Sequence, residues 1–285
     1  MITASTPDRK AALLEELRKL PAFFRRDLLV TWSYKLQFFT DWINLIGQVV
    51  VFYFVSGLVN PSAMPTYGDT QTSYLQFVTI GIAVTSFLQV SLARVTAAIR
   101  NEQLQGTLET LLLTPTAPAT FQIGSAMYEL AYVPVRVVLF LGFAAIIFGV
   151  HYNVAGLPET VAVLVVFVPF VWGLGVISAA ATLTYRRGTS FVGAGASALT
   201  ITSGAYFPVT AFEKFPILNW LALHNPITLA LYAIRNLLLG DWGWRQTMPV
   251  LAILLPVAAA TLAAGVWAFR AALRREQRRG TLGLY

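Results

Sequence analysis

Six long stretches of the chain contain no charged residue. They cover residues 42–68, 70–93, 137–158, 160–185, 188–212 and 246–269. A helix that spans a bilayer needs about 20 mostly apolar residues, and each stretch is long enough. We therefore predict an all-α polytopic membrane protein with six transmembrane helices.

A seventh uncharged stretch, residues 215–234, has a different character. It contains five residues that interrupt or polarise a helix: Pro216, Asn219, His224, Asn225 and Pro226. The residue before a proline avoids the helical region of backbone space. The sequence therefore predicts a helix break at Asn225-Pro226 rather than a continuous seventh span.

The distribution of basic residues supports six spans over seven. Short cytoplasmic loops of membrane proteins carry an excess of Lys and Arg. With six spans and the N-terminus inside, the inner segments hold 16 of the 20 Lys and Arg residues. A seventh span would move the Arg-rich C-terminal tail outside. We therefore expect both termini to be cytoplasmic and residues 208–240 to form a re-entrant or surface-lying hairpin on the outer side.

The composition fits a membrane protein and excludes several classes of site. Apolar residues make up 56% of the chain and charged residues 12%, whereas soluble domains average about 25% charged residues. The net charge of +7 then reflects topology first, and we expect no nucleic-acid partner. The chain has no cysteine and two histidines, which excludes thiolate chemistry and leaves too few ligands for a zinc site.

The first 41 residues predict an amphipathic helix lying along the membrane. Leu13, Leu17 and Leu20 recur at helical spacing, and after Pro21 the apolar series continues with Phe24 and other large side chains. Such a helix buries its apolar face at the interface. The expected organisation is thus an N-terminal segment 1–41, a transmembrane domain 42–270 and a basic cytoplasmic tail 271–285.

The loop after the second span predicts a short amphipathic helix over residues 101–115. Four leucines fall on one helical face: Leu104, Leu108, Leu111 and Leu112. A short helix of this kind can dock into a groove on another protein. The alternative is a helix on the lipid surface, but such helices favour Lys and Arg, and this one carries Glu102 and Glu109.

Two segments resemble the membrane subunits of type 2 ABC exporters. The segment 101–115, NEQLQGTLETLLLTP, is similar to the first cytoplasmic loop of that family. The segment 203–240, SGAYFPVTAFEKFPILNWLALHNPITLALYAIRNLLLG, resembles the signature before the last span, with its Ser-Gly, Phe-Pro, Asn-Pro, Arg and Leu-Leu-Gly elements. The likeness extends over about residues 25–270 and fits six spans with an amphipathic N-terminus.

The resemblance implies roles for particular residues. The 101–115 helix would couple the chain to an ATPase subunit, through Glu102, Leu104, Gly106, Leu108, Glu109, Leu111 and Leu112. Arg186 and Arg187 would form a second, smaller contact. Phe207, Pro208, Asn225 and Pro226 would belong to an external gate. Since six spans make half of the usual pathway, the family implies a second permease subunit, as a homodimer.

The chain encodes no ATP site of its own. A phosphate-binding loop requires the pattern GxxxxGK[ST], and none of the four lysines, Lys10, Lys19, Lys35 and Lys214, follows a glycine. We therefore expect no enzymatic activity and no cofactor in this chain. ATP and Mg would be bound by a separate ATPase subunit present in two copies. The expected location of this chain is a prokaryotic plasma membrane.

A few polar residues lie in or beside the predicted spans and are candidates for the substrate pathway. They are Asn44, Gln48, Glu129 and Arg136. Charged groups inside a membrane are costly and usually functional, although Glu129 and Arg136 near a span end could instead reach the interface. The expected substrate is hydrophobic or amphipathic, such as a drug or a lipid-linked molecule. Export of a polysaccharide or glycolipid is the alternative.

Two other protein classes remain to be weighed. Gly195-Ala196-Ser197-Ala198 resembles the serine motif of rhomboid proteases, but that chemistry needs a base beside the serine. Both histidines, His151 and His224, fall in outer segments, so small residues such as Gly193 and Ser197 are better explained as a helix-packing face. A passive channel would leave the 101–115 helix without a role.

Overall fold

The computed structural model describes residues 21–22, 24–26, 28–29, 35–68, 70–104, 118–185 and 188–279. The helices are α2 Lys35–Ser56, α3 Tyr74–Leu104, α5 Pro118–Phe148, α6 Leu157–Thr184, α7 Gly188–Thr202, α8 Pro216–His224, α9 Pro226–Leu239 and α10 Trp244–Arg279. Three short 3-10 helices cover Pro61–Ala63, Val154–Gly156 and Val209–Phe212. Strands β1 (Thr66–Tyr67) and β2 (Thr70–Gln71) pair antiparallel, with Thr66 opposite Gln71.

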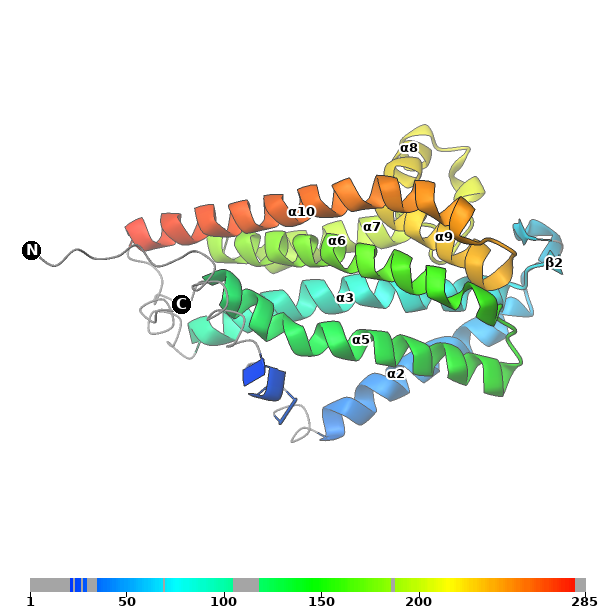
Figure 1. The fold of residues 1–285 in the computed structure, drawn as a ribbon, viewed down its shortest axis with the longest axis horizontal. Helices are drawn as coiled ribbons and strands as arrows, with labels where there is room; N and C mark the ends of the chain where they lie inside the picture. Colours follow the sequence, from blue (N-terminus) through cyan, green and yellow to red (C-terminus); the bar gives the residue numbers. More distant parts are fainter. Residues whose placement is uncertain are drawn as a thin grey trace, which may run out of the picture.

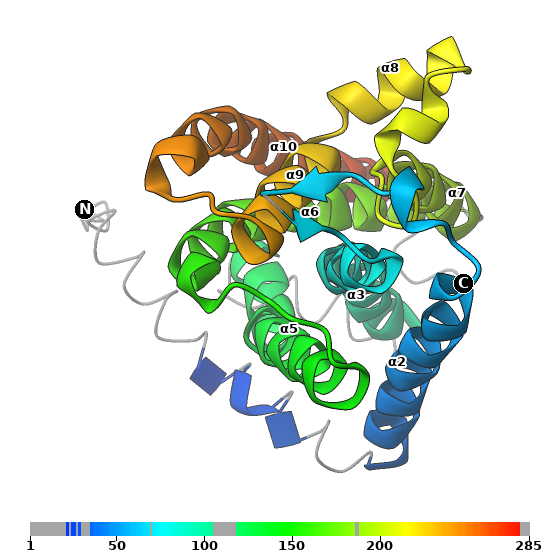
Figure 2. The ribbon, with the colours of Figure 1, turned by 90° about the vertical axis from the view of Figure 1, so that its right-hand side faces the viewer.

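The long helices α3, α5, α6 and α10 run side by side along the molecule (Figure 1). One end, which we call the hairpin end, carries β1, β2, α8, α9 and the loop between α5 and α6. The opposite end carries the C-terminus of α10 with its arginines, and we call it the basic end. Viewed from the hairpin end, α2 and α7 flank α3 on one side of the bundle, and α10 lies on the other (Figure 2).

Helix α6 is the centre of the bundle and packs most extensively against α10 and α3. Small residues make this possible. A Cβ added at Gly173 of α6 would lie 2.7 Å from backbone atoms of Thr261 and Leu262 in α10. Close backbone approach through small residues is how helices associate in membranes. Between α3 and α6 a buried hydroxyl pair adds a polar link, since Thr96 Oγ1 and Ser178 Oγ are 2.6 Å apart.

The core is densest towards the hairpin end. Its largest fully buried side chains include Phe77 and Leu88 of α3, Phe167 of α6 and five residues of α9. Those five are Ile227, Leu231, Ile234, Leu237 and Leu238. Helix α9 has only 14 residues, too few to cross a bilayer at 1.5 Å per residue. Its stability therefore comes from this tertiary burial.

The helices do not coincide with the uncharged stretches. The stretch 42–68 contains α2 only as far as Ser56, followed by a 3-10 turn and β1. The stretch 137–158 leaves α5 at Phe148, and the stretch 188–212 leaves α7 at Thr202. The loop residues that fall inside these stretches are uncharged, and some are polar, as in Asn60-Pro61-Ser62. The absence of charge therefore overestimates the helices at the hairpin end.

At the basic end the helices extend beyond the uncharged stretches. Helix α3 continues to Leu104, so residues 101–104 prolong it instead of opening a separate helix. Helix α10 continues to Arg279 and includes most of the predicted tail. Lys and Arg have good helix propensity, so charge does not end a helix as it ends a membrane-buried segment. Residues 21–22, 24–26 and 28–29 are also helical.

Three helical segments of the described chain are long and apolar enough to cross a membrane. They are Tyr74–Ala97, Val154–Thr184 and Trp244–Glu276. The count rises to four if α8 and α9, which bend by 67° at their junction, form one broken span. Shorter apolar helices cover Trp42–Ser56, Tyr132–Phe148 and Val192–Thr202. The chain is thus an all-α integral membrane protein, and the count of six spans stays a prediction.

Candidate functional site at the hairpin end

The break between α8 and α9 is organised by Asn225. Its Oδ1 accepts a hydrogen bond from the backbone N–H of Ile227 at 3.0 Å, and so caps α9. Its Nδ2 donates to the backbone oxygen of Leu199 at 2.8 Å and to Thr202 Oγ1 at 3.2 Å, both in α7. The predicted break at Asn225-Pro226 is therefore confirmed. The side chain of Asn225 also ties the break to the C-terminus of α7.

Arg235 is the other residue that joins these elements. Its side chain is only 4% exposed, and its guanidinium donates to three backbone carbonyls. Nη1 donates to Gly204 at 2.9 Å, and Nη2 donates to Ala205 at 3.0 Å. Nη2 and Nε donate to Phe77 at 3.1 and 3.3 Å. We call Arg235, Phe77, Gly204 and Ala205 the Arg235 clamp, which holds α9, α3 and the end of α7 together.

The chemistry of the Arg235 clamp follows from where its carbonyls lie. Gly204 and Ala205 come just after the C-terminus of α7, where a helix presents unpaired carbonyls and partial negative charge. Gly81 lets α3 approach this turn, because a Cβ at Gly81 would collide with the Ala205 carbonyl. The guanidinium also lies over the Phe77 ring, with Cζ 3.4 Å from the ring centroid, an attractive cation–π contact.

Tyr67 of β1 completes the surroundings of Arg235. Its side chain is buried, and burial raises the pKa of the phenol above its ordinary value while the positive charge of Arg235 opposes the rise. At Gly68 the backbone turns with a φ of +63°, which favours glycine. The β1–β2 turn therefore brings an aromatic hydroxyl to the guanidinium from outside the helical bundle.

The loop between α5 and α6 is fastened to the same region. The backbone N–H of Asn153 donates to Leu238 at 2.6 Å, and its Nδ2 donates to Gly240 at 2.9 Å. Tyr152 Oη lies 3.0 Å from Thr79 Oγ1 of α3. Burial raises the pKa of Tyr152 to about 12, while the hydrogen bond with Thr79 lowers it. The three loops of the hairpin end thus form one connected structure.

An aromatic group lies between α2 and the turn after α7. Phe52 stacks on Tyr206, with ring centroids 5.7 Å apart and planes at 20°. Phe52 also meets Tyr74 at 6.3 Å between centroids. Offset aromatic pairs stabilise by about 0.5–1.5 kcal/mol beyond their burial. This group links the half of α2 nearer the hairpin end to the elements that Arg235 holds.

The predicted gate residues separate into two kinds. Asn225 is buried and bonded as described, and Pro226 begins α9. Phe207 is exposed, and Pro208 precedes the 3-10 helix Val209–Phe212. Helix α8 is exposed on nearly all sides, with five large apolar side chains at its surface. These are Ile217, Leu218, Trp220, Leu221 and Leu223.

The predicted pathway residues do not form one described cluster. Asn44 and Gln48 are exposed on α2, where Thr40, Asn44 and Gln48 recur every four residues on one face. Arg136 lies half-buried in α5. Glu129 also belongs to α5, and its side chain is outside the described part. The structure therefore supports a polar row on α2, and a pathway role for Glu129 and Arg136 stays a prediction.

The predicted coupling residues lie at the basic end or outside the described residues. Glu102 and Leu104 are in the last turn of α3, without described side chains. The others lie outside the described residues: Gly106, Leu108, Glu109, Leu111, Leu112, Arg186 and Arg187. Among the described residues, no three His, Asp or Glu side chains are grouped to hold a metal ion.

Arg235 was not among the functional residues predicted from the sequence, although the sequence contains a sign of its importance. Arg235 is the one charged residue in the run from 215 to 240. A charge inside such an apolar run is expected to be paired or bonded. The partners could not be read from the sequence, because they are backbone carbonyls 30, 31 and 158 residues away.

The comparisons with known proteins give one family. The profile of the ABC-2 type transporter family matches residues 18–239, which include α2 to α9 and so the whole Arg235 clamp. The comparison with curated proteins finds no match.

Proposed function

The chain belongs to the ABC-2 type transporter family and is the membrane-embedded permease component of an ABC transporter, and from this premise we propose that it works as one half of an ATP-driven exporter. The family implies association with an ABC ATP-binding subunit. We propose that two copies of that subunit hydrolyse ATP with Mg, and that two copies of this chain enclose the substrate pathway. The location we propose is a prokaryotic plasma membrane, with both termini in the cytoplasm.

The exposed faces of α2 and α7 support a second permease subunit. The row Thr40, Asn44 and Gln48 lies on the exposed face of α2. Polar side chains in membrane helices face a bundle interior or water and not lipid. On the same side of the bundle (Figure 2), α7 exposes Gly193 and Gly195, at which an added Cβ would meet nothing within 4 Å. Small residues are typical of membrane helix interfaces.

We therefore assign the α2–α7 side as the face between the two subunits, where the pathway runs. In that arrangement Asn44 and Gln48 line the pathway or the subunit contact beside it. The Phe52–Tyr206 stack lies at its hairpin end. The apolar side chains that alternate with the polar row, such as Ile43 and Val51, are also exposed, which supports a hydrophobic or amphipathic substrate.

The geometry of the hairpin end supports an outer gate. Asn225 and Arg235 bind α9 to α7 and α3 through side-chain hydrogen bonds, so α9 and the end of α7 move together. Helix α8 has apolar side chains at its surface, which suits a segment that dips into the outer membrane interface. We propose that α8 and α9 form the re-entrant hairpin that closes the outer end of the pathway.

Coupling to the ATPase is proposed for the basic end. Helix α3 connects the two ends, since it begins in the Arg235 clamp region and continues to Leu104. Leu104 ends α3, and the segment that follows it in the sequence carries the other predicted coupling leucines, Leu108, Leu111 and Leu112. ATP binding would draw the two ATPase subunits together, and this segment would pass the movement through α3 to the outer gate. A continuous helix is a stiff connection suited to such transmission.

The observation that carries this proposal is the family match over residues 18–239 together with the absence of a phosphate-binding loop from the sequence. The test is phosphate release by the purified chain, alone and with its ATPase subunit, in lipid vesicles. We expect no turnover from the chain alone and ATP-dependent substrate accumulation from the complex. ATP turnover that stays with the isolated chain after removal of trace contaminants would contradict the assignment of ATP hydrolysis to a separate subunit.

A further inference from the structure

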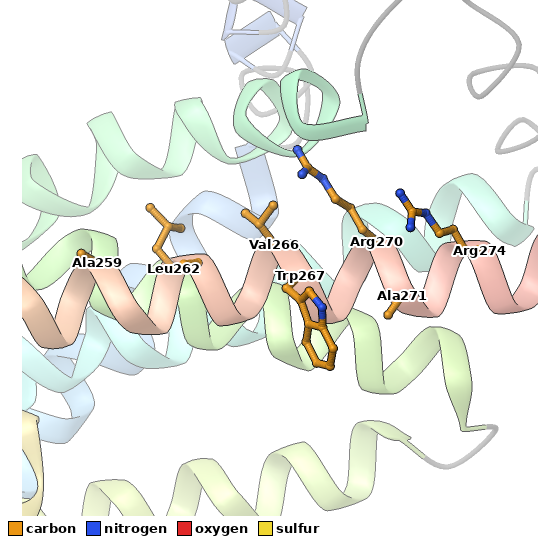
Figure 3. A pocket seen from close by; sticks show the side chains of 8 residues that line it. Ala259, Leu262, Val266, Trp267, Arg270, Ala271 and Arg274 are labelled. Carbon is orange, nitrogen blue, oxygen red and sulfur yellow. The ribbon is translucent and has the colours of Figure 1, made fainter.

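A groove runs along the exposed face of α10 toward the basic end. Among the described residues, eight line it (Figure 3), and these belong to α10: Ala259, Leu262, Ala263, Val266, Trp267, Arg270, Ala271 and Arg274. Its volume is about 670 Å³. The lining residues recur at spacings of three and four, so they form a stripe over about four helical turns.

The chemistry changes along this stripe. From Ala259 to Val266 the lining is aliphatic, then Trp267 is 73% exposed, and then come Arg270 and Arg274. Figure 3 shows both arginines pointing to the same side of α10 as Leu262 and Val266. Neither guanidinium makes a hydrogen bond or ion pair with a partner in the described structure. The α10 groove, as we call these eight residues, is thus apolar at one end and cationic at the other.

We propose that the α10 groove binds an anionic phospholipid, with an acyl chain along residues 259–266 and the headgroup phosphate on Arg270 and Arg274. The apolar part covers about eight residues, or about 12 Å of helix. One leaflet is about 15 Å deep, half of the hydrocarbon thickness. Trp267 then falls at the level where aromatic side chains prefer the interface, and the arginines reach the headgroups, where guanidinium binds phosphate in a bidentate manner.

Charge favours a lipid over a second copy of this chain in the same groove. Subunits that pair across a two-fold axis along the membrane normal meet at equal depths, so Arg270 and Arg274 would face their own copies. Like charges opposed at an interface cost several kcal/mol. Helix α10, which carries the groove residues, also lies on the side of the bundle opposite α2 (Figure 2). The α10 groove therefore stays open to lipid when the α2–α7 face is covered.

The binding test uses the purified full-length chain in a neutral detergent, with retained lipids counted by native mass spectrometry as phosphatidylglycerol or phosphatidylcholine is added. We expect phosphatidylglycerol to bind preferentially. The double variant Arg270→Gln/Arg274→Gln should bind it about 25-fold more weakly, because each basic residue near an anionic surface adds about fivefold to the affinity. The matched control is Arg275→Gln/Arg278→Gln, which removes two exposed arginines of α10 outside the groove and should bind within about twofold of wild type.

A second measurement does not depend on the arginine variants. Bromine on the acyl chains of a lipid quenches the fluorescence of nearby tryptophans. In nanodiscs, we compare wild type with Trp267→Phe to find the part of the quenching that Trp267 accounts for. This part should be larger with brominated phosphatidylglycerol than with brominated phosphatidylcholine. Equal binding of the two lipids, or equal loss in the control double variant, would overturn the proposal. Binding of glycerol phosphate without acyl chains at the same affinity would overturn it as well. So would efficient disulfide cross-linking between two copies carrying Trp267→Cys, because it would place a second subunit in the groove. None of these readouts requires transport, so they are independent of the proposed function.

Discussion

The guanidinium of Arg235 lies 3.4 Å above the ring of Phe77 and also donates two hydrogen bonds to the carbonyl of that residue. One residue of α9 thus holds α3 by both backbone and side chain. A buried cation bonded to carbonyls at a helix C-terminus is stabilised without a carboxylate partner. The Arg235 clamp makes α9 part of the bundle, although α9 lies next to the almost fully exposed α8.

The first prediction concerns the Arg235 clamp. Arg235→Ala removes the donors to three carbonyls and should lower the free energy of unfolding by about 3 kcal/mol or more. Arg235→Lys keeps the charge but not the planar fork, so it should lie between wild type and Arg235→Ala. The measurement is the apparent Tm of the purified protein in detergent.

The control for this experiment is Arg245→Lys and Arg245→Ala. Arg245 is exposed at the start of α10, so both changes should leave the Tm within a degree or two of wild type. Equal Tm values for Arg235→Lys and wild type would show that the fork geometry does not matter. The Arg235 clamp would then be an ordinary buried charge.

The second prediction uses pH. Burial raises the pKa of Tyr152 to about 12, above the ordinary value of about 10. Between these two pKa values, Tyr152 therefore keeps its phenol proton in the folded protein, whereas the unfolded chain has lost it. The resulting stability is fully present below pH 10 and is lost as the pH rises from about 10 to 12. Tyr152→Phe should reduce this fall in Tm.

At neutral pH the same variant should lose only the hydrogen bond to Thr79, about 1 kcal/mol. If the Tm still falls steeply at alkaline pH in Tyr152→Phe, groups other than Tyr152 cause the fall. Tyr67 is one of these groups, since burial also raises its pKa. A Tyr67→Phe variant separates the two contributions.

The third prediction tests the topology with single cysteines, which the cysteine-free chain allows. Cysteine at His151 or Lys214, both exposed at the hairpin end, should react with a membrane-impermeant maleimide added to intact cells. Cysteine at Thr107 or Gly283 should react only after the membrane is opened. Labelling of Gly283→Cys from outside, with Thr107→Cys still protected, would require an odd number of spans between the two positions and would remove the re-entrant assignment of α8 and α9.

The fourth prediction concerns the face between subunits. Gln48→Cys on α2 or Ser197→Cys on α7 should form cross-links between two copies in native membranes, because both residues are exposed and both helices lie on the side that we assign to the partner (Figure 2). Ile253→Cys, exposed on α10, is the control and should stay monomeric. The reverse pattern would move the dimer contact to α10.

Local rules predicted the parts of this fold that depend on neighbouring residues. The break at Asn225-Pro226 follows from proline alone, and it is present. The helical character of the chain followed from its apolar stretches. Helix bounds were harder, because uncharged loops such as 149–153 resemble a span in composition, while the charged segment 101–104 is a continuation of α3.

Tertiary contacts could not be predicted in the same way. Asn225 could be placed at a break, but not the bond from its amide to Leu199. Arg235 could be noticed as an isolated charge, but not its carbonyl partners from α3 and the end of α7. The α10 groove follows a helical periodicity that is visible in the sequence. That Arg270 and Arg274 have no hydrogen bond or ion pair in the described part of the chain could not be predicted from the sequence.

The central claim is that a separate ATPase drives this permease through the segment 101–115. Burying one leucine stabilises an interface by about 1.5–3 kcal/mol, whereas an exposed ion pair contributes about 0.2–1 kcal/mol. The most direct measurement is co-purification of the ATPase subunit with the tagged chain, together with substrate-stimulated ATP hydrolysis, for Leu108→Asp and its matched control Glu109→Gln. We predict that Leu108→Asp loses the ATPase or its stimulation, while Glu109→Gln retains the complex with a mildly reduced rate. Normal assembly and normal stimulation in Leu108→Asp would contradict the account.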